Sequence, residues 1–263
     1  MKRALIRVLY GEPKNVAHDH CECRSRIDKD IRSVINRKGD EDFVVYCFGE
    51  ANYKFVKDLG HKNVVLADKN VWIDGEVPFS FLNKIHAWEY ALQDYDEIVY
   101  LDWDTIQIKP FPPDFWDILA SKESIQSCLA RYHKGVLSWR RYRPDRANKL
   151  VSSGCFVYIR DKEIPGKLLK LADDPLFNEN IYYPKKRRIP GIISPKQWSD
   201  EIYISKYTDS ICGGWDGVEK YFKLFEPKWC LVEKPQFLED KQDACFKHPV
   251  KGKEYVQNCI ACS

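Results

Sequence analysis

The chain has 263 residues, of which 44% are hydrophobic and 14% aromatic. These are enough apolar side chains for the core of a large α/β domain and too many for a disordered protein. The 42 Lys and Arg residues nearly balance the 39 Asp and Glu residues, leaving a net charge of +3, so bulk charge gives no sign of a nucleic-acid-binding protein.

In the first hundred residues, short apolar runs alternate with segments of helical spacing. The runs predict strands at 4–9, 43–48 and 63–66, and the spacing predicts helices at 27–35, 51–59 and 81–92, the last with Ser80 as its cap. The order strand, helix, strand, helix, strand predicts a parallel sheet with right-handed crossovers.

The most informative stretch runs from Ile98 to Asp104. An apolar, β-branched run followed by two acids predicts a strand that is buried on both faces and ends at Asp102 and Asp104. In an extended segment these two side chains project to one face and Trp103 to the other, so the two carboxylates can share a divalent cation. Because ligands of open α/β sheets bind beyond the carboxyl ends of the strands, we expect a metal and diphosphate site here.

Lys84 lies beside the apolar stripe of the predicted helix at 81–92, directly before this strand. Two interpretations remain open. Lys84 is either a surface lysine whose stem lies along apolar surface, or a cation that reaches a phosphate beside the metal.

The rest of the chain continues the α/β pattern. We predict a helix at 115–120, strands at 125–130 and 155–159, a helix at 168–172, a long loop at 175–195, a helix at 202–207 and short strands between 211 and 250. The small residues 152–154 allow close approach of a ligand or of a neighbouring backbone. Asp200 and Glu201 open the last helix, where they either complement the helix dipole or act on a substrate.

Ten cysteines and the absence of an apolar run of about 18 residues bear on the location of the protein. Cys47, Cys128 and Cys155 lie in apolar runs, which is typical of buried, reduced thiols. The segments His18–Cys23 and Cys259–Cys262 could bind zinc, but they lack the paired knuckles of a structural zinc site. With no secretory h-region after Met1, we expect a cytoplasmic protein without a membrane span.

Together these motifs resemble the GT-A glycosyltransferases, and among them glycosyltransferase family 8, which includes glycogenin and bacterial galactosyltransferases. The resemblance extends from Ala4 to about Lys253 and rests most strongly on the Asp-x-Asp segment. It implies the α/β GT-A (Rossmann-like) nucleotide-diphospho-sugar transferase fold, with a mostly parallel central sheet flanked by helices. It also implies a single domain over residues 1–263, with a nucleotide-binding part at about 1–110 and an acceptor-side part at about 111–263.

The resemblance assigns roles to individual residues. The implied ligands of Mn²⁺ or Mg²⁺ are Asp102, Asp104 and His248. Asp200 and Glu201 would face the transferred sugar as catalytic residues. The implied donor-binding residues are Leu9, Tyr10, Gly11, Lys84, Asp102, Trp103, Asp104, Ser153, Gly154, Gly252 and Lys253.

Two positions depart from the family pattern. The late family motif is His-x-x-Gly-x-x-Lys, whereas Gly252 lies four residues after His248, which leaves open which lysine reaches the phosphate. Glu201 stands where the family has Gln. A carboxylate there would act either as a general base in an inverting transfer or as a stabiliser of an oxocarbenium-like centre in a retaining transfer.

The function implied is metal-dependent transfer of a sugar from a nucleotide-sugar donor, in particular a UDP-sugar, to a carbohydrate, glycan or other acceptor. A sugar-1-phosphate nucleotidyltransferase is an alternative, although Gly11–Lys14 makes a poor phosphate-binding loop. A non-catalytic carbohydrate-binding protein is another, since eight Trp and fifteen Tyr residues could line a sugar groove, but a binding protein has no need of paired acids.

Overall fold

The structure is a computed structural model, and it describes residues 1–10, 41–67, 82–102, 106–107, 113–121, 125–129, 152–171, 204, 207, 210, 230–232 and 246–248. For 106–107, 125–129, 152–155, 230–232 and 246–248 the description covers the backbone alone. The predicted helix at 27–35, the predicted loop at 175–195 and the segments His18–Cys23 and Cys259–Cys262 lie outside the described residues.

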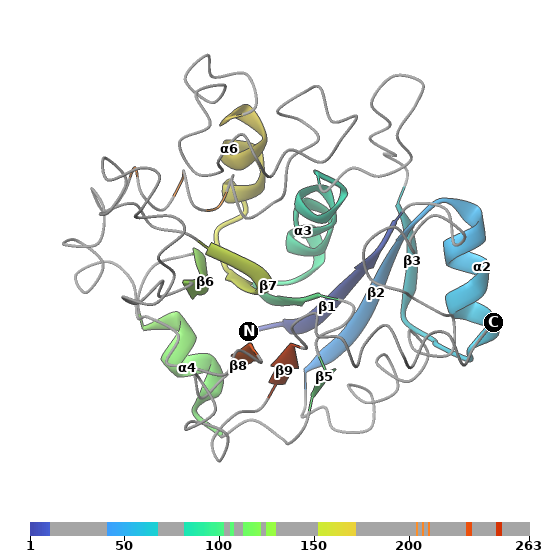
Figure 1. Ribbon diagram of the computed structural model, residues 1–263, viewed down its shortest axis with the longest axis horizontal. Helices are drawn as coiled ribbons and strands as arrows, with labels where there is room; N and C mark the ends of the chain where they lie inside the picture. Colours follow the sequence, from blue (N-terminus) through green and yellow to red (C-terminus); the bar gives the residue numbers. More distant parts are fainter. Residues whose placement is uncertain are drawn as a thin grey trace, which may run out of the picture.

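A six-stranded sheet with the order β3-β2-β1-β4-β7-β6 forms the centre of the fold (Figure 1). Strands β1, β2, β3 and β4 are parallel, whereas β7 is antiparallel to β4 and β6 is antiparallel to β7. The mostly parallel central sheet predicted from the sequence is therefore confirmed. The strands are β1 (Arg3–Leu9), β2 (Asp42–Phe48), β3 (Val64–Ala67), β4 (Glu97–Leu101), β6 (Ile125–Leu129) and β7 (Ser152–Ile159).

A second sheet has three short strands in the order β5-β9-β8. Strand β5 (Ile106–Gln107) pairs antiparallel with β9 (Phe246–His248), which pairs parallel with β8 (Cys230–Val232). This sheet places a segment near the end of the chain beside the segment that follows Asp104.

Helices cover both faces of the central sheet. Helices α3 (Leu82–Asp94) and α6 (Ile164–Lys170) pack on one face, and α2 (Glu50–Asp58) and α4 (Phe115–Ala120) pack on the other. None of the helices in the described part of the chain is long and apolar enough to cross a membrane. The flanked sheet predicted from the sequence is confirmed.

Burial on both faces of the sheet explains why the sequences of the central strands are nearly continuous apolar runs. All five residues of β4 are buried, and its side chains alternate between the two cores. Ile98 and Tyr100 pack with α3, whereas Val99 and Leu101 pack with α4. The prediction of a strand buried on both faces is confirmed.

The second half of the chain differs from its prediction mainly at element boundaries. Helix α6 begins at Ile164, four residues before the predicted start at 168, because Pro165 lies in the first helical turn, where proline is tolerated. Strand β7 begins at Ser152, so the small residues 152–154 belong to the strand itself. Residues 204, 207 and 210 are helical, in agreement with a helix after Glu201.

A buried carboxylate ties three strands together at the amino end of β4. Glu97 is 0% exposed and accepts hydrogen bonds from Arg3 Nε on β1 at 2.5 Å and from the Tyr158 hydroxyl on β7 at 2.6 Å. The Arg3 guanidinium lies over the Trp116 ring, 5.5 Å from its centroid. Burial, followed by the hydrogen bond to Glu97, raises the pKa of Tyr158. The hydroxyl therefore stays protonated and donates to the carboxylate.

Cys47 confirms the expected buried thiol. It is free and 0% exposed on β2, and burial raises its pKa to about 12. Because the thiolate is the reactive form, this thiol is inert near neutral pH. The side chains of Cys128 and Cys155 lie outside the described atoms.

The raised pKa of Tyr95 predicts that the folded state loses stability at alkaline pH. Its hydroxyl donates to Asp42 at 3.0 Å, and burial, followed by this hydrogen bond, raises its pKa to about 12. Unfolded tyrosine has a pKa of about 10, so the unfolded state loses this proton first as the pH rises. The stabilisation is complete below about pH 10 and is lost as the pH rises from about 10 to about 12.

We therefore expect urea midpoints to fall between about pH 10 and about pH 11, and to fall less steeply in Tyr95→Phe. Equal slopes in the variant and the unmodified protein would show that Tyr95 does not contribute.

Candidate active site

The site begins at the edge where the parallel strands end. Strands β1 and β4 pair in parallel, so their carboxyl ends meet, and Asp102 is the first residue after β4. Leu9 and Tyr10, at the end of β1, are 4% and 5% exposed and pack into opposite cores. Asp102 thus lies at the edge where open α/β sheets bind their ligands.

The Asp102 carboxylate is held by two donors from different elements. Lys84 Nζ on α3 lies 2.7 Å from Oδ1, and the Tyr100 hydroxyl on β4 donates to the same oxygen. The side chain of Asp102 is 18% exposed, whereas that of Lys84 is 6% exposed. The partly exposed carboxylate of Asp102 is therefore paired with the more deeply buried ammonium group of Lys84.

Helix α3 positions the lysine. It runs back from the carboxyl edge of the sheet, and its first turn brings Lys84 onto the buried face together with Ile85 and Trp88. Lys84 Nζ also lies over the Tyr100 ring, 5.4 Å from its centroid, an arrangement that favours a cation. Lys84 is 4% exposed. The interpretation of Lys84 as a surface lysine is wrong, because its ammonium pairs inward with Asp102.

A buried ion pair is weak evidence for stability, since apolar residues of similar volume often stabilise a fold as well or better. At the ligand edge of the sheet, a function explains the Lys84–Asp102 pair more directly than a structural need does.

Arg7 is a site residue that sequence reasoning missed. It lies within β1, is 1% exposed, and its Nη1 donates to the main-chain carbonyl of Asp102 at 3.1 Å. Side chains alternate along a strand, so Arg7 shares a face with Leu5 and Leu9, opposite to Lys84. The one available signal was a charged residue inside an apolar strand. Asp102 is thus held through its side chain from one face of the sheet and through its backbone from the other.

Two predicted segments approach this edge along the backbone. Strand β7 is antiparallel to β4, and Leu101 pairs with Phe156, so Ser153 and Gly154 lie at the end of β7 nearest Asp102. His248 follows Lys247, which pairs with Ile106 of β5, two residues after Asp104 in the sequence. The structure brings both segments toward the site, and their side chains lie outside its description.

The remaining predicted site residues lie outside the described part of the chain: Gly11, Trp103, Asp104, Asp200, Glu201, Gly252 and Lys253. Within the described residues, His, Cys, Asp and Glu side chains form no group of three or more that could hold a metal ion. Asp102 is the member of the predicted metal set whose side chain the structure describes. Its hard oxygen donors suit Mg²⁺ or Mn²⁺, which usually take one or two protein carboxylates.

Comparison with solved structures shows that this is the GT-A fold of glycosyltransferases, so the predicted fold class is confirmed. The apo form of mouse xyloside xylosyltransferase 1 matches with a TM-score of 0.55 and 9% identity over 94% of this chain and 97% of that one. The galactosyltransferase LgtC, in complex with donor and acceptor sugar analogs, matches with a TM-score of 0.54 and 10% identity over 99% and 96% of the two chains.

A third structure is an active-site Gln-to-Glu mutant of LgtC, which matches with a TM-score of 0.53 and 12% identity over 100% of this chain and 96% of that one. No protein-family model and no curated protein matches the sequence. At these identities the likeness establishes the fold, whereas the chemistry depends on the residues of the site.

Lys84→Met tests the buried ion pair. It removes the ammonium and leaves the Asp102 carboxylate without its cation, which for a buried pair costs about 3–5 kcal/mol. Because Asp102 is 18% exposed, we expect a loss near the lower end of that range, measured by urea unfolding.

The matched control is Lys54→Met on α2, where Lys54 pairs with Asp58 at 2.9 Å and the two side chains are 76% and 62% exposed. Exposed pairs of this spacing contribute about 0.3–0.5 kcal/mol. Similar losses in the two variants would contradict the buried, charge-paired state of Lys84.

Proposed function

We propose that the protein is a metal-dependent glycosyltransferase that moves a sugar from a nucleotide-sugar donor, in particular a UDP-sugar, to a carbohydrate or other acceptor. The observation that carries the proposal is the Asp102 carboxylate, held by Lys84 at the carboxyl end of β4. The same fold in LgtC, solved in complex with donor and acceptor sugar analogs, supports this choice.

Asp102 would hold Mn²⁺ or Mg²⁺ together with Asp104 and His248. The pairing of Lys247 with Ile106 supports this set. Asp104 precedes Ile106 by two positions in the sequence. A cation bound there would act as a Lewis acid that stabilises negative charge on the departing diphosphate.

Charged residues of the chain would stabilise the opposite charges that develop during the reaction. Cleavage of the sugar–phosphate bond places negative charge on UDP and positive charge on the anomeric carbon. The buried ammonium of Lys84 is a fixed positive charge at the site, and Lys253 would add a second, with Gly252 allowing close approach of the phosphate. Asp200 and Glu201 would orient the sugar and balance its positive charge.

The other donor contacts follow the edge of the sheet. Leu9, Tyr10 and Gly11, at and just after the end of β1, would contact the nucleoside. Trp103 would contact the donor between the two acids, and Ser153 and Gly154 would approach it from β7.

Asp102→Asn tests the proposal. The amide keeps the shape of the side chain but loses the charge that binds the cation, and loss of one such electrostatic contribution lowers turnover by about 10²–10³-fold. We expect Mn²⁺-dependent release of UDP from a panel of UDP-sugars by the unmodified protein and a loss of this size in the variant. Both are compared at temperatures at which the variant is folded, because the substitution also removes the charged partner of Lys84.

The matched control is Glu97→Gln, the same carboxylate-to-amide change at the other end of β4, where Glu97 is 0% exposed. It should keep its turnover at temperatures at which it is folded. Turnover retained in Asp102→Asn would exclude the metal role of Asp102. Formation of UTP and sugar 1-phosphate when pyrophosphate is added to the UDP-sugar, with no release of UDP, would identify a nucleotidyltransferase. Formation of neither UDP nor UTP would identify a binding protein.

A further inference from the structure

We propose that Tyr100 is a positioning residue whose hydroxyl sets the direction of the Asp102 carboxylate, and thereby the affinity of the site for the divalent cation. The inference rests on the proposed function and goes one step further, to a residue that does not itself touch donor or metal. Tyr100 lies two residues before Asp102 and is 0% exposed.

Two contacts converge on one oxygen of the Asp102 carboxylate. The Tyr100 hydroxyl and Lys84 Nζ both donate to Oδ1 of Asp102. Two donors from different elements on a single oxygen fix the rotation of the carboxylate, and so the direction of both of its oxygens. Arg7 holds the main-chain carbonyl of the same residue at 3.1 Å, so Asp102 cannot turn as a whole.

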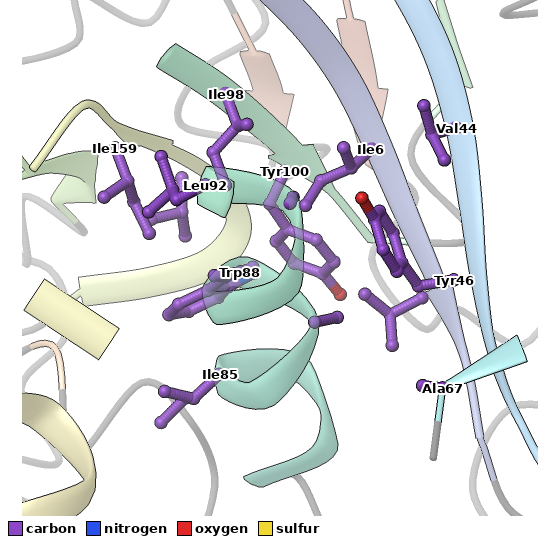
Figure 2. Close-up of a cluster of buried hydrophobic side chains, with 14 of the residues drawn as sticks. Ile6, Val44, Tyr46, Ala67, Ile85, Trp88, Leu92, Ile98, Tyr100 and Ile159 are labelled. Atoms are coloured by element: carbon purple, nitrogen blue, oxygen red, sulfur yellow. The ribbon is translucent and has the colours of Figure 1, made fainter. Parts of the chain in front are cut away.

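The phenol ring of Tyr100 is held rigidly by its packing. Tyr100 packs in the core between β4 and α3, where its ring centroid lies 5.5 Å from that of Trp88 with 56° between the planes. Figure 2 shows the Tyr100 ring beside Trp88, among the apolar side chains of the central strands. A buried aromatic ring in such packing holds its hydroxyl at a fixed place. The hydroxyl therefore positions the carboxylate instead of following it.

A carboxylate with similar partners lies at each end of β4, Glu97 at its start and Asp102 just after its last residue. Glu97 also accepts from a tyrosine hydroxyl and from a cation, Tyr158 at 2.6 Å and Arg3 at 2.5 Å. The side chain of Glu97 is 1% exposed, whereas that of Asp102 is 18% exposed. Each carboxylate thus has one tyrosine hydroxyl and one cation as partners, which bind different oxygens of Glu97 but the same oxygen, Oδ1, of Asp102. The Glu97 group is closed to solvent, whereas the Asp102 group is open to a ligand. The closed group at Glu97 holds three strands together. The open group at Asp102 orients a carboxylate that can bind a ligand.

Partners that orient metal-binding side chains typically change metal affinity by about 10–100-fold when they are removed. We therefore expect Tyr100→Phe to raise the dissociation constant of Mn²⁺, measured with UDP present from the free-Mn²⁺ signal in electron paramagnetic resonance, by at least about tenfold. Phenylalanine keeps the ring that packs against Trp88. The KM for Mn²⁺ should rise by a similar factor, and kcat at saturating Mn²⁺ should return close to that of the unmodified protein.

The matched control is Tyr158→Phe, which removes the hydroxyl that donates to Glu97 from the same core. A purely structural role for both hydroxyls predicts equal changes in the two variants. A positioning role predicts unchanged Mn²⁺ affinity in Tyr158→Phe and weakened affinity in Tyr100→Phe. Equal Mn²⁺ affinity in Tyr100→Phe and the unmodified protein, with both folded, would overturn the inference and leave the proposed function standing. An unmodified protein that binds no Mn²⁺ with UDP would overturn both.

A measurement without any substitution covers the case in which Tyr100→Phe does not fold. A single ¹³C label at Cζ of Tyr100 reports its hydrogen bond by NMR. Addition of Mg²⁺ and UDP should shift this resonance more than that of a protein labelled at Tyr158 instead. Equal shifts at the two labels, or none at Tyr100 while UDP and Mg²⁺ are bound, would contradict the positioning role.

Discussion

The ion pair between Lys84 and Asp102 is the contact on which the site depends. Its two partners come from α3 and from the end of β4, and they lie 2.7 Å apart. A buried ammonium requires a partner, because its desolvation is costly. Helix α3 can therefore pack with Lys84 inward only if the carboxylate is at the end of the strand. The packing of α3 on the sheet and the position of Asp102 at the end of β4 therefore depend on each other.

The sheet explains why this constraint lies at a ligand site. Parallel strands that are covered on both faces bring their carboxyl ends to a single edge. Strand β7, running antiparallel beside β4, returns its small residues to that edge, and the β5–β9 pairing adds a segment from near the end of the chain. Solved structures with only 9–12% identity share this fold, which indicates that the pattern of burial specifies it more than individual residues do.

The sequence predicted those parts of the structure that depend on periodicity. Apolar runs and helical spacing predicted strand β4, helix α3 and the parallel order of the first strands. A strand buried on both faces has a continuous apolar sequence, and a helix buried along one stripe has apolar residues at helical spacing. The start of α6 was missed because a proline is read as a breaker, although Pro165 lies in the first turn, where its missing N–H costs nothing.

For the site, the sequence singled out Asp102 and Lys84 but could not say that they pair with each other. Nor did it reveal Arg7 or Tyr100, because a polar group in an apolar strand does not show what it will meet across the sheet. Such contacts depend on register between strands and on the face that a helix buries. The roles of Asp104, Asp200, Glu201 and Lys253 stay predictions.

Thermal melting with UDP and Mn²⁺, together and separately, and with GDP or CDP in place of UDP, is the most direct test of the proposed site. A ligand that binds only the folded state at about 100 times its dissociation constant adds about 2.7 kcal/mol of stability. For a chain of this size that corresponds to a rise in Tm of roughly 5–10 °C. The site at Asp102 predicts a rise that requires UDP and Mn²⁺ together and that is smaller with GDP or CDP. An unchanged Tm with every nucleotide, with or without the metal, would contradict it.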